Sequence, residues 1–279
     1  MIRSLWIAKT GLDSQQTNLD VITNNLANAQ TTAFKRLRPV FSELLYQNLR
    51  ATGLVQGKDI SHPGFGGPGE YISIPAGLSV GNGSQVLATQ RINSQGQVIR
   101  TENPLDLAIK GLGYFKVATS TAPAPDTQAF TRAGNFMRDN QGYIVTPTGH
   151  YLLDCFDRPI RIPANADSIV IAEDGMVTYT TGGFNPIVAA QIGTYTFMNP
   201  AGLSNGGNDL YFETPASGGP NLNTPGSVGH GPLLQYYTEQ SNVNIAEELV
   251  GLIAAQRAYE ITTRSISAAD SLLQKLGTI

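Results

Sequence analysis

The side chains of this sequence that could take part in catalysis are mainly aspartates in predicted turns. They are Asp139, Asp154, Asp157 and Asp174. Two carboxylates on a β scaffold can act together in hydrolysis. Aspartates in turns, however, usually accept hydrogen bonds from nearby backbone N–H groups. We therefore expect these side chains to stabilise turns, and a hydrolase is kept as the alternative from a different functional class.

Histidine and cysteine offer little further chemistry. His62, His150 and His230 are far apart, and each lies in a stretch rich in Gly or Pro. Neither a His-x-x-x-His metal motif nor a Gly-x-Ser-x-Gly elbow occurs. The single cysteine, Cys155, stands among apolar residues and is expected to be a small buried hydrophobe. We expect no catalytic residue, no cofactor and no metal, so the protein is not expected to be an enzyme.

Composition argues against several other classes of protein. Of 279 residues only 14% are charged, and a net charge of −3 leaves no basic stripe that could neutralise nucleic-acid phosphates. No apolar run reaches the length of about 18 residues that a membrane-spanning helix needs. The first residues, MIRSLWIAKTGL, are too polar for the apolar core of a secretory signal. We expect any export to use a route without a cleavable signal peptide.

Both ends of the chain carry a seven-residue apolar repeat. Near the N-terminus it comprises Leu5, Leu12, Leu19 and Leu26. Near the C-terminus it comprises Ile245, Leu252, Tyr259, Ile266 and Leu273. Such a repeat keeps one side of a helix against a partner helix. We expect two coiled-coil-like helices that pair with each other and form the assembly interface, with their low-charge opposite faces against neighbouring copies.

Two segments after the first helix contain different signals. An apolar set at near-helical spacing lies within residues 31–50, namely Phe34, Phe41, Leu44, Leu45 and Tyr46. Residues 53–69 hold eight Gly or Pro in 17 positions, a density that excludes a regular helix. We assign 36–70 to an extended linker or loop region.

The centre of the chain has the pattern of an antiparallel β domain. Strand-like segments between residues 71 and 198 recur at spacings near ten residues, with turn signals and no helical pattern between them. Asp174-Gly175, between SIVIA at 168–172 and MVTYT at 176–180, is the clearest hairpin signal. Residues 199–240 form a Gly- and Pro-rich return segment. The predicted class is α+β, with 1–35 and 241–279 as the paired terminal helices.

The last helix has a recognisable start. Asn244 is followed three residues later by Glu247, which has the character of a capping box, and Glu248 adds a second anion near the positive end of the helix dipole. The periodic pattern then continues almost to Ile279.

Motifs at the inner edges of both helices resemble those of a known family. The N-terminal motif residues are Asn24, Asn25, Asn28, Thr31, Phe34 and Lys35. The C-terminal ones are Ser241, Asn242, Glu247, Gln256 and Arg257. Asp106-Leu107-Ala108-Ile109 and Phe130-Thr131-Arg132 are further matches in the centre. Together they are similar to the signatures of the bacterial flagellar rod and hook proteins, over nearly the whole chain and most closely to distal-rod members.

The resemblance implies a structural subunit. Members of this family pair their terminal helices as an inner domain, carry the β domain outside it, and polymerise helically into the axial drive shaft that transmits motor torque to the hook. It implies contacts with copies of the same chain, with proximal-rod and hook proteins and with the surrounding basal-body rings. It also implies export by the flagellar type III apparatus and a location in the rod that crosses the periplasm.

Alternatives within and outside the family remain open at this stage. A hook or proximal-rod subunit would share the same motifs. A carbohydrate-binding or adhesive β module could use aromatic side chains such as Tyr195 and Phe197. The asparagines Asn24, Asn25 and Asn28 suit either helix capping or a hydrogen-bond ladder between subunits, and the two roles are compatible.

Two residues depart from the family pattern. Ala33 stands where the family usually has glycine before the Phe34-Lys35 pair. A left-handed backbone there would cost an alanine roughly 1 kcal/mol, so the local turn could differ from that of the family. Tyr236 replaces a residue that is commonly small.

Overall fold

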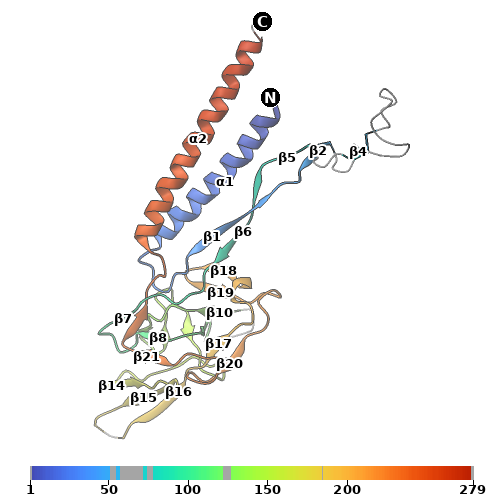
Figure 1. The fold of residues 1–279 in the computed structure, drawn as a ribbon. Helices are drawn as coiled ribbons and strands as arrows, with labels where there is room; N and C mark the ends of the chain where they lie inside the picture. The colour runs from blue at the N-terminus through green and yellow to red at the C-terminus, as the bar shows by residue number, and fades with distance from the viewer. Residues whose placement is uncertain are drawn as a thin grey trace, which may run out of the picture. The chain divides into compact units, whose positions relative to one another are not determined.

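The computed structural model describes residues 2–50, 55–56, 72–73, 78–121, 127–183 and 185–277. A long helix lies at each end of the chain and antiparallel strands lie between them, which confirms the α+β class (Figure 1). The chain forms two compact units. The helix unit comprises residues 1–22, 39–89 and 250–279, and the β unit comprises residues 23–38 and 90–249. Among the described residues no helix is long and apolar enough to cross a membrane.

Both helices lie inside the ranges expected for them, 1–35 and 241–279, and the first ends earlier than expected. α1 spans Ile2–Ala27 and α2 spans Ile245–Gly277. At the start of α2 the Asn244 side-chain oxygen accepts the Ala246 N–H at 3.1 Å, and the Asn244 carbonyl accepts the Glu248 N–H at 3.0 Å. Asn244 therefore caps the helix, as its spacing from Glu247 predicts.

Within the helix unit the two helices run in opposite directions (Figure 1). A Cβ built on Gly11 would lie 3.8 Å from Thr262 Cγ2, and one built on Gly251 would lie 3.6 Å from Ile22 Cδ1. Residue 11 thus faces 262 while residue 22 faces 251, which is the register of an antiparallel pair. Small residues at these positions allow the helix backbones to come close.

The segment after α1 is extended and not helical. Its strands are β1 (Leu37–Glu43), β2 (Gln47–Arg50) and β3 (Val55–Gln56), which pair with β6 (Ser84–Arg91), β5 (Leu78–Val80) and β4 (Ile72–Ser73) respectively. The near-helical spacing of apolar residues in 31–50 is therefore misleading. Pro39 lies inside this stretch and would lose a helical hydrogen bond there, whereas an extended strand tolerates it.

Within the helix unit α1 also contacts β5, β6 and the turn between them. Ser14 Oγ lies 3.1 Å from Ser84 Oγ, and Arg3 donates to the Val80 carbonyl at 2.9 Å. Gly83 has φ +106°, and a Cβ on it would lie 2.0 Å from Thr10 Oγ1. Only glycine fits between α1 and the turn at this position.

The β unit is organised around a seven-stranded antiparallel sheet. The strand order is β11-β12-β13-β9-β10-β19-β18. These strands are β9 (Phe115–Ala118), β10 (Gln128–Thr131), β11 (Met137–Arg138), β12 (Ile144–Val145), β13 (Tyr151–Leu152), β18 (Ser204–Gly207) and β19 (Leu210–Phe212). Residues beyond 198 thus enter the main sheet, since β18 and β19 lie in the segment expected to return the chain to α2.

Smaller ladders complete the β unit. β14 (Ser168–Ile171), β15 (Met176–Thr180) and β16 (Ile187–Gln191) form one sheet, and β17 (Thr194–Thr196) pairs with β20 (Asn221–Asn223). β21 (Leu233–Gln235) pairs with β8 (Leu107–Ile109), and β22 (Tyr237–Glu239) pairs with β7 (Val98–Arg100). The last two ladders join the segment before α2 to residues near 100. The hairpin predicted at Asp174-Gly175 is confirmed, because Ile171 pairs with Val177 across it.

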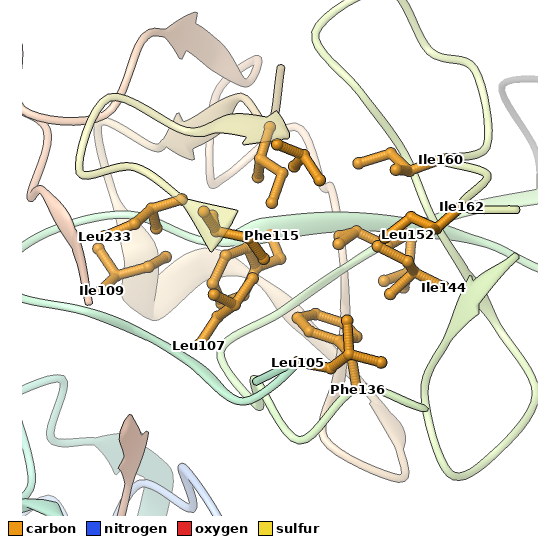
Figure 2. Close-up of a cluster of buried hydrophobic side chains, with 14 of the residues drawn as sticks. Leu105, Leu107, Ile109, Phe115, Phe136, Ile144, Leu152, Ile160, Ile162 and Leu233 are labelled. Carbon is orange, nitrogen blue, oxygen red and sulfur yellow. The ribbon is translucent and has the colours of Figure 1, made fainter. Parts of the chain in front are cut away.

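The core of the β unit lies between these sheets. Its fully buried side chains include Leu107, Ile109, Phe115, Phe136, Ile144, Leu152, Ile160, Ile162 and Leu233 (Figure 2). A second cluster is aromatic and comprises Tyr114, Phe130, Tyr195, Phe197, Leu203 and Tyr211. The Phe130 and Phe197 rings meet edge to face at 4.8 Å. Such contacts are worth about 0.5–1.5 kcal/mol beyond the area that they bury.

The edge strand β14 is covered by a side chain. The Gln235 amide donates to the Ile169 carbonyl at 3.0 Å, and its oxygen accepts the Ile171 N–H at 3.1 Å. The same amide donates to the Pro104 carbonyl at 2.8 Å. One side chain therefore imitates part of a neighbouring strand along this edge.

Both departures from the family pattern lie at left-handed backbone. Ala33 has φ +59° and Tyr236 has φ +67°. The Ala33 N–H donates to the Glu239 carbonyl at 2.8 Å, and the Tyr236 N–H donates to the Asp106 carbonyl at 2.9 Å. The turn at residue 33 is thus left-handed despite the alanine, which bears the strain.

Candidate assembly interface

The four aspartates considered for catalysis are held by other groups of the protein, three of them by nearby backbone N–H groups. Asp154 Oδ1 accepts the Phe156 and Arg158 N–H groups, both at 2.8 Å. Asp139 and Asp174 accept backbone N–H groups one and two residues ahead, at 2.7 and 3.1 Å. Asp157 pairs with Lys116 at 2.6 Å. Among the described residues no three His, Cys, Asp or Glu side chains gather where they could hold a metal ion.

The other side chains considered for catalysis or metal binding lie apart from one another in the described part of the chain. Burial lowers the pKa of His230, whose ring nitrogens lie 3.0 Å from Thr194 Oγ1 and 3.3 Å from Thr196 Oγ1. Burial, and next the charge of Asp154, raises the pKa of Cys155. His150 contacts Thr119 instead, and His62 lies outside the described residues. The structure does not bring these groups together.

The aromatic side chains considered for carbohydrate binding are buried. Tyr195 is 3% exposed and Phe197 is 7% exposed, and both belong to the aromatic cluster of the β unit. Sugar-binding aromatics present a ring face to solvent. These two therefore cannot form such a platform.

The heptad residues of α1 lie on its flank. Leu5, Leu12, Leu19 and Leu26 are all half-buried. Among the α1 side chains that the structure describes, the buried ones are Ser14, Val21, Ile22 and Asn25. The leucine stripe thus keeps part of its apolar surface free in a single copy.

The heptad residues of α2 differ from one another in exposure. Leu252 and Ile266 are half-buried, whereas Ile245 is 47% and Tyr259 is 38% exposed. The side chain of Leu273 lies outside the described residues. The face that α2 turns inward runs through Ala255, which is 4% exposed.

The outer face of α2 is apolar to an unusual degree. Val250 and Ile261 are each 68% exposed, and Ile253 is 50% exposed. With Ala254, Arg257 and Ala258 they line a shallow groove. The motif residues Gln256 and Arg257 are also exposed. Contiguous exposed apolar surface of this kind is typical of a protein–protein contact.

The other motif residues form a clasp inside the β unit, defined here as Asn25, Arg36, Leu37, Asn242 and Glu248. Asn25 accepts the Leu37 N–H at 2.9 Å and donates to the Leu37 carbonyl at 2.8 Å. Its amide also donates to Glu248 at 3.3 Å. Asn25 is 1% exposed, so its side chain is used within the chain and is closed to other copies.

Arg36 and Asn242 complete the clasp. Arg36 Nε lies 2.6 Å from the buried Glu248 carboxylate, and Arg36 NH1 lies 3.1 Å from the exposed Glu247. Asn242 Oδ1 accepts the Arg36 N–H at 2.7 Å, and its amide donates to the Ile92 and Ser94 carbonyls at 2.9 and 3.0 Å. The end of α1 and the start of α2 are thereby fastened to the same few residues.

The other asparagines end the first helix. The Asn28 amide donates to the Asn24 carbonyl at 2.9 Å, and Thr31 Oγ1 donates to Asn28 Oδ1 at 3.1 Å. Phe34 contributes its carbonyl, which accepts the Asn242 N–H at 3.3 Å, and Ser241 Oγ accepts the Val243 N–H at 3.3 Å. The Asn28 side chain thus satisfies a carbonyl of the last turn of α1, and Asn24 provides that carbonyl.

A buried ion cluster, comprising Lys35, Arg132 and Glu239, lies beside the clasp. Lys35 Nζ lies 2.5 Å from Glu239 Oε1, and Arg132 Nε lies 2.8 Å from Glu239 Oε2. The three side chains are 4%, 7% and 1% exposed respectively. Arg132 also donates to the Gly113, Ile109 and Gly111 carbonyls, and Lys35 donates to the Ser94 carbonyl at 2.9 Å.

Burial and the neighbouring charges shift the pKa values in this cluster in opposite directions. Burial would raise the pKa of Glu239, but the charges of Arg132 and Lys35 and the hydrogen bonds they donate lower it on balance. Burial lowers the pKa of Lys35, and the charge and hydrogen bond of Glu239 only partly offset that. The carboxylate is therefore ionised at neutral pH and held by two cations.

Sequence reasoning missed two of the acidic residues in this region. Glu239 carries no local signal of burial, and Glu248 looks like an exposed anion of the first helical turn. Glu239 is 204 residues from Lys35 and 107 from Arg132 along the chain. The available signal was the position of Lys35 and Arg132 in family motifs, since a buried cation requires an anion nearby.

Comparisons with known proteins agree with these motifs. The family model described as flagella basal body rod protein matches residues 5–35. The flagellar hook protein FlgE/F/G D1 domain matches 108–179, and the flagellar basal body rod FlgEFG protein C-terminal matches 234–279. The flagellar basal-body rod protein FlgG of Buchnera aphidicola (subspecies Acyrthosiphon pisum) is 43% identical over 281 residues, with all of both chains covered. The chain belongs to the flagellar basal-body rod protein family.

Two relatives from Bacillus subtilis are also similar to this chain over nearly their whole length. Its flagellar basal-body rod protein FlgG is 36% identical, covering 99% of this chain and 98% of that one. Its flagellar hook-basal body complex protein FlhP is 27% identical, with both chains fully covered. The rod protein family thus accounts for both terminal helices and for the β unit between them.

Proposed function

We propose that this chain is a structural subunit of the distal rod, and that copies of it polymerise helically into the shaft that transmits motor torque to the hook. The observation that carries this proposal is full-length similarity to proteins named flagellar basal-body rod protein FlgG. The exposed apolar face of α2 supports it, because a subunit of a polymer needs surface that only its neighbours cover.

The design suits a mechanical part. A heterologous contact that does not close on itself generates a helical filament, and repeated weak contacts share an applied load along it. The clasp and the buried ion cluster would hold the last residues of α1 and the first residues of α2 to the strands of the β unit. The assembly contacts then come from the outer faces of α1 and α2 and from their half-buried stripes.

The proposal includes neighbours and a location. Copies of this chain are the main partners, and proximal-rod proteins, hook proteins and the basal-body rings adjoin them. The polymer lies in the part of the rod that crosses the periplasm. Subunits reach it through the flagellar type III export apparatus.

A hook or proximal-rod subunit is the second candidate. Two of the family models that match carry names shared by hook and rod proteins, so they do not separate these roles. Identity of 36–43% over nearly the whole chain to proteins named basal-body rod protein favours the rod. A straight, rigid polymer in electron micrographs would support the rod, and a curved, flexible one would support the hook.

Replacing a stripe leucine tests the assembly role. Leu12→Asp and Leu252→Asp place a charge on half-buried sides of α1 and α2. We expect each variant, expressed in cells that lack the chromosomal gene, to fail to build rods, as seen by electron microscopy of isolated basal bodies. The near-ultraviolet circular dichroism of each purified full-length variant, which reports the buried tyrosines of the β unit, is expected to stay normal. Leu112→Asp, at a leucine that is 65% exposed in the β unit, is the matched control. Normal rods from both stripe variants would contradict the proposal.

A further inference from the structure

α1 presents an acidic face to solvent. Asp13 and Asp20 are both exposed and lie seven residues apart, which places them on one side of the helix two turns apart. Neither carboxylate has an ion-pair partner among the described residues. The nearby cation Lys9 lies over the Trp6 ring, 5.5 Å from its centroid. We call Asp13 and Asp20 the acidic face.

α2 presents a basic face with the same spacing. Arg257 and Arg264 are exposed and also seven residues apart. Arg264 is 82% exposed, and its one contact is a long one of 3.8 Å to Glu260 on the same helix. The exposed apolar side chains Ile253 and Ile261 lie beside the arginines. We call Arg257 and Arg264 the basic face.

The two faces cannot meet within one copy. Inside the helix unit α1 meets α2 through Gly11 and Ile22, while α2 meets α1 through Thr262 and Gly251. At about 100° per residue, Asp13 and Asp20 lie roughly opposite to Gly11 and Ile22 around α1. By the same count Arg257 and Arg264 lie on the far side of α2 from Thr262.

We propose that the acidic face of α1 in one copy docks on the basic face of α2 in a second copy. The equal spacing lets two carboxylates meet two guanidinium groups at once, and guanidinium groups bind carboxylates with two parallel hydrogen bonds. The apolar side chains beside the arginines are covered in the same contact. Because each copy offers both faces on opposite sides, the contact is heterologous and continues from copy to copy. This inference rests on the proposed function and names the surfaces that carry it.

Charge reversal tests the pairing in cells that lack the chromosomal gene. D13R/D20R makes both faces of a copy basic, and R257D/R264D makes both faces acidic. We expect either variant alone to abolish rods, since two attractive pairs per contact become repulsive. We expect rods to return when the two variants are expressed together, because each then meets an opposite face on its neighbour. The fourfold variant D13R/D20R/R257D/R264D is expected to build rods alone.

The controls separate folding and charge from docking. E102R/E213R changes the same number of charges at exposed acids of the β unit and is expected to leave rods intact. Helical circular dichroism of each purified variant is expected to match that of the unaltered protein. Failure of both the mixture and the fourfold variant, with normal circular dichroism, would overturn the pairing. Cells that lack the gene and carry no plasmid copy are expected to build no rods. Rods in those cells would overturn the proposed function itself, whatever the variants do.

Discussion

Replacing Glu239 by glutamine removes the one negative charge from a buried cluster that holds two positive charges. Glu239 Oε1 lies 2.5 Å from Lys35 Nζ and accepts the Gly96 N–H at 2.9 Å, while Oε2 lies 2.8 Å from Arg132 Nε. Glutamine keeps the shape of the side chain. It replaces an acceptor by an NH₂ group, which must face one of the two cations.

The size of the effect follows from burial. Removing one partner of a buried ion pair costs about 3–5 kcal/mol, because the remaining charge is left without compensation. Arg132 retains its bond to the Gly113 carbonyl, and Lys35 retains its bond to the Ser94 carbonyl. We therefore expect the lower end, about 3 kcal/mol, which lowers the urea midpoint of the β unit by roughly 1–3 M.

Unfolding of the two units can be followed separately, because their tryptophan and buried tyrosine side chains lie in different units. Trp6 is the only tryptophan and lies in α1, so its fluorescence reports the helix unit. Tyr114, Tyr195 and Tyr211 are buried in the β unit, and their near-ultraviolet circular dichroism reports that unit. The tyrosine signal of the Glu239→Gln variant should therefore be lost at lower urea. Glu173→Gln, at an exposed glutamate, is the matched control.

Lys35→Met provides a second measurement if the first variant does not fold. It leaves Glu239 with Arg132 as a neutral pair and removes the cation that burial disfavours. It should therefore destabilise the β unit less than Glu239→Gln. A larger loss of stability in Lys35→Met, or an unchanged midpoint in Glu239→Gln, would refute the reasoning.

Three further outcomes are expected. Because Arg132 and Lys35 lower the pKa of Glu239 in the folded protein, its stabilisation is present above the ordinary glutamate pKa of about 4.3 and is lost as pH falls through the lowered value. Glu239→Gln should flatten that part of an acid titration followed by tyrosine circular dichroism. Ala33→Val puts a β-branched residue at φ +59° and should cost about 1–2 kcal/mol in urea unfolding, whereas Ala33→Gly should be nearly neutral because relief of strain offsets one lost methyl. Gly134→Ala would place a Cβ 1.7 Å from the Leu107 carbonyl oxygen and should prevent the β unit from folding, as judged by soluble yield, while Gly219→Ala, 3.9 Å from its nearest neighbour, should not.

The helices and turns could be predicted because their signals are local. Asn244 caps α2, and Asp174-Gly175 forms a hairpin, and in each case the determining residues lie within a few positions of one another. β1 could not be assigned in this way, because its partner β6 begins more than 40 residues later and the spacing of its own apolar residues suits either structure.

The buried charges illustrate the same limit. Glu239 and Glu248 are 1% and 2% exposed, although a single sequence gives glutamate no reason to be buried. Their partners come from the other end of the chain. Positions of the C-terminal heptad also differ in burial within one copy, since Tyr259 is 38% exposed while Ala255 is 4% exposed.

The Gln235 side chain along β14 has a consequence for how this protein avoids aggregation. An uncovered edge strand is a template on which a second chain can add its own strand, and such growth competes with any designed assembly. The Gln235 amide occupies the Ile169 carbonyl and the Ile171 N–H, two of the groups that an incoming strand would need. A protein that grows by contacts between helices is thereby kept from growing by contacts between strands at this edge.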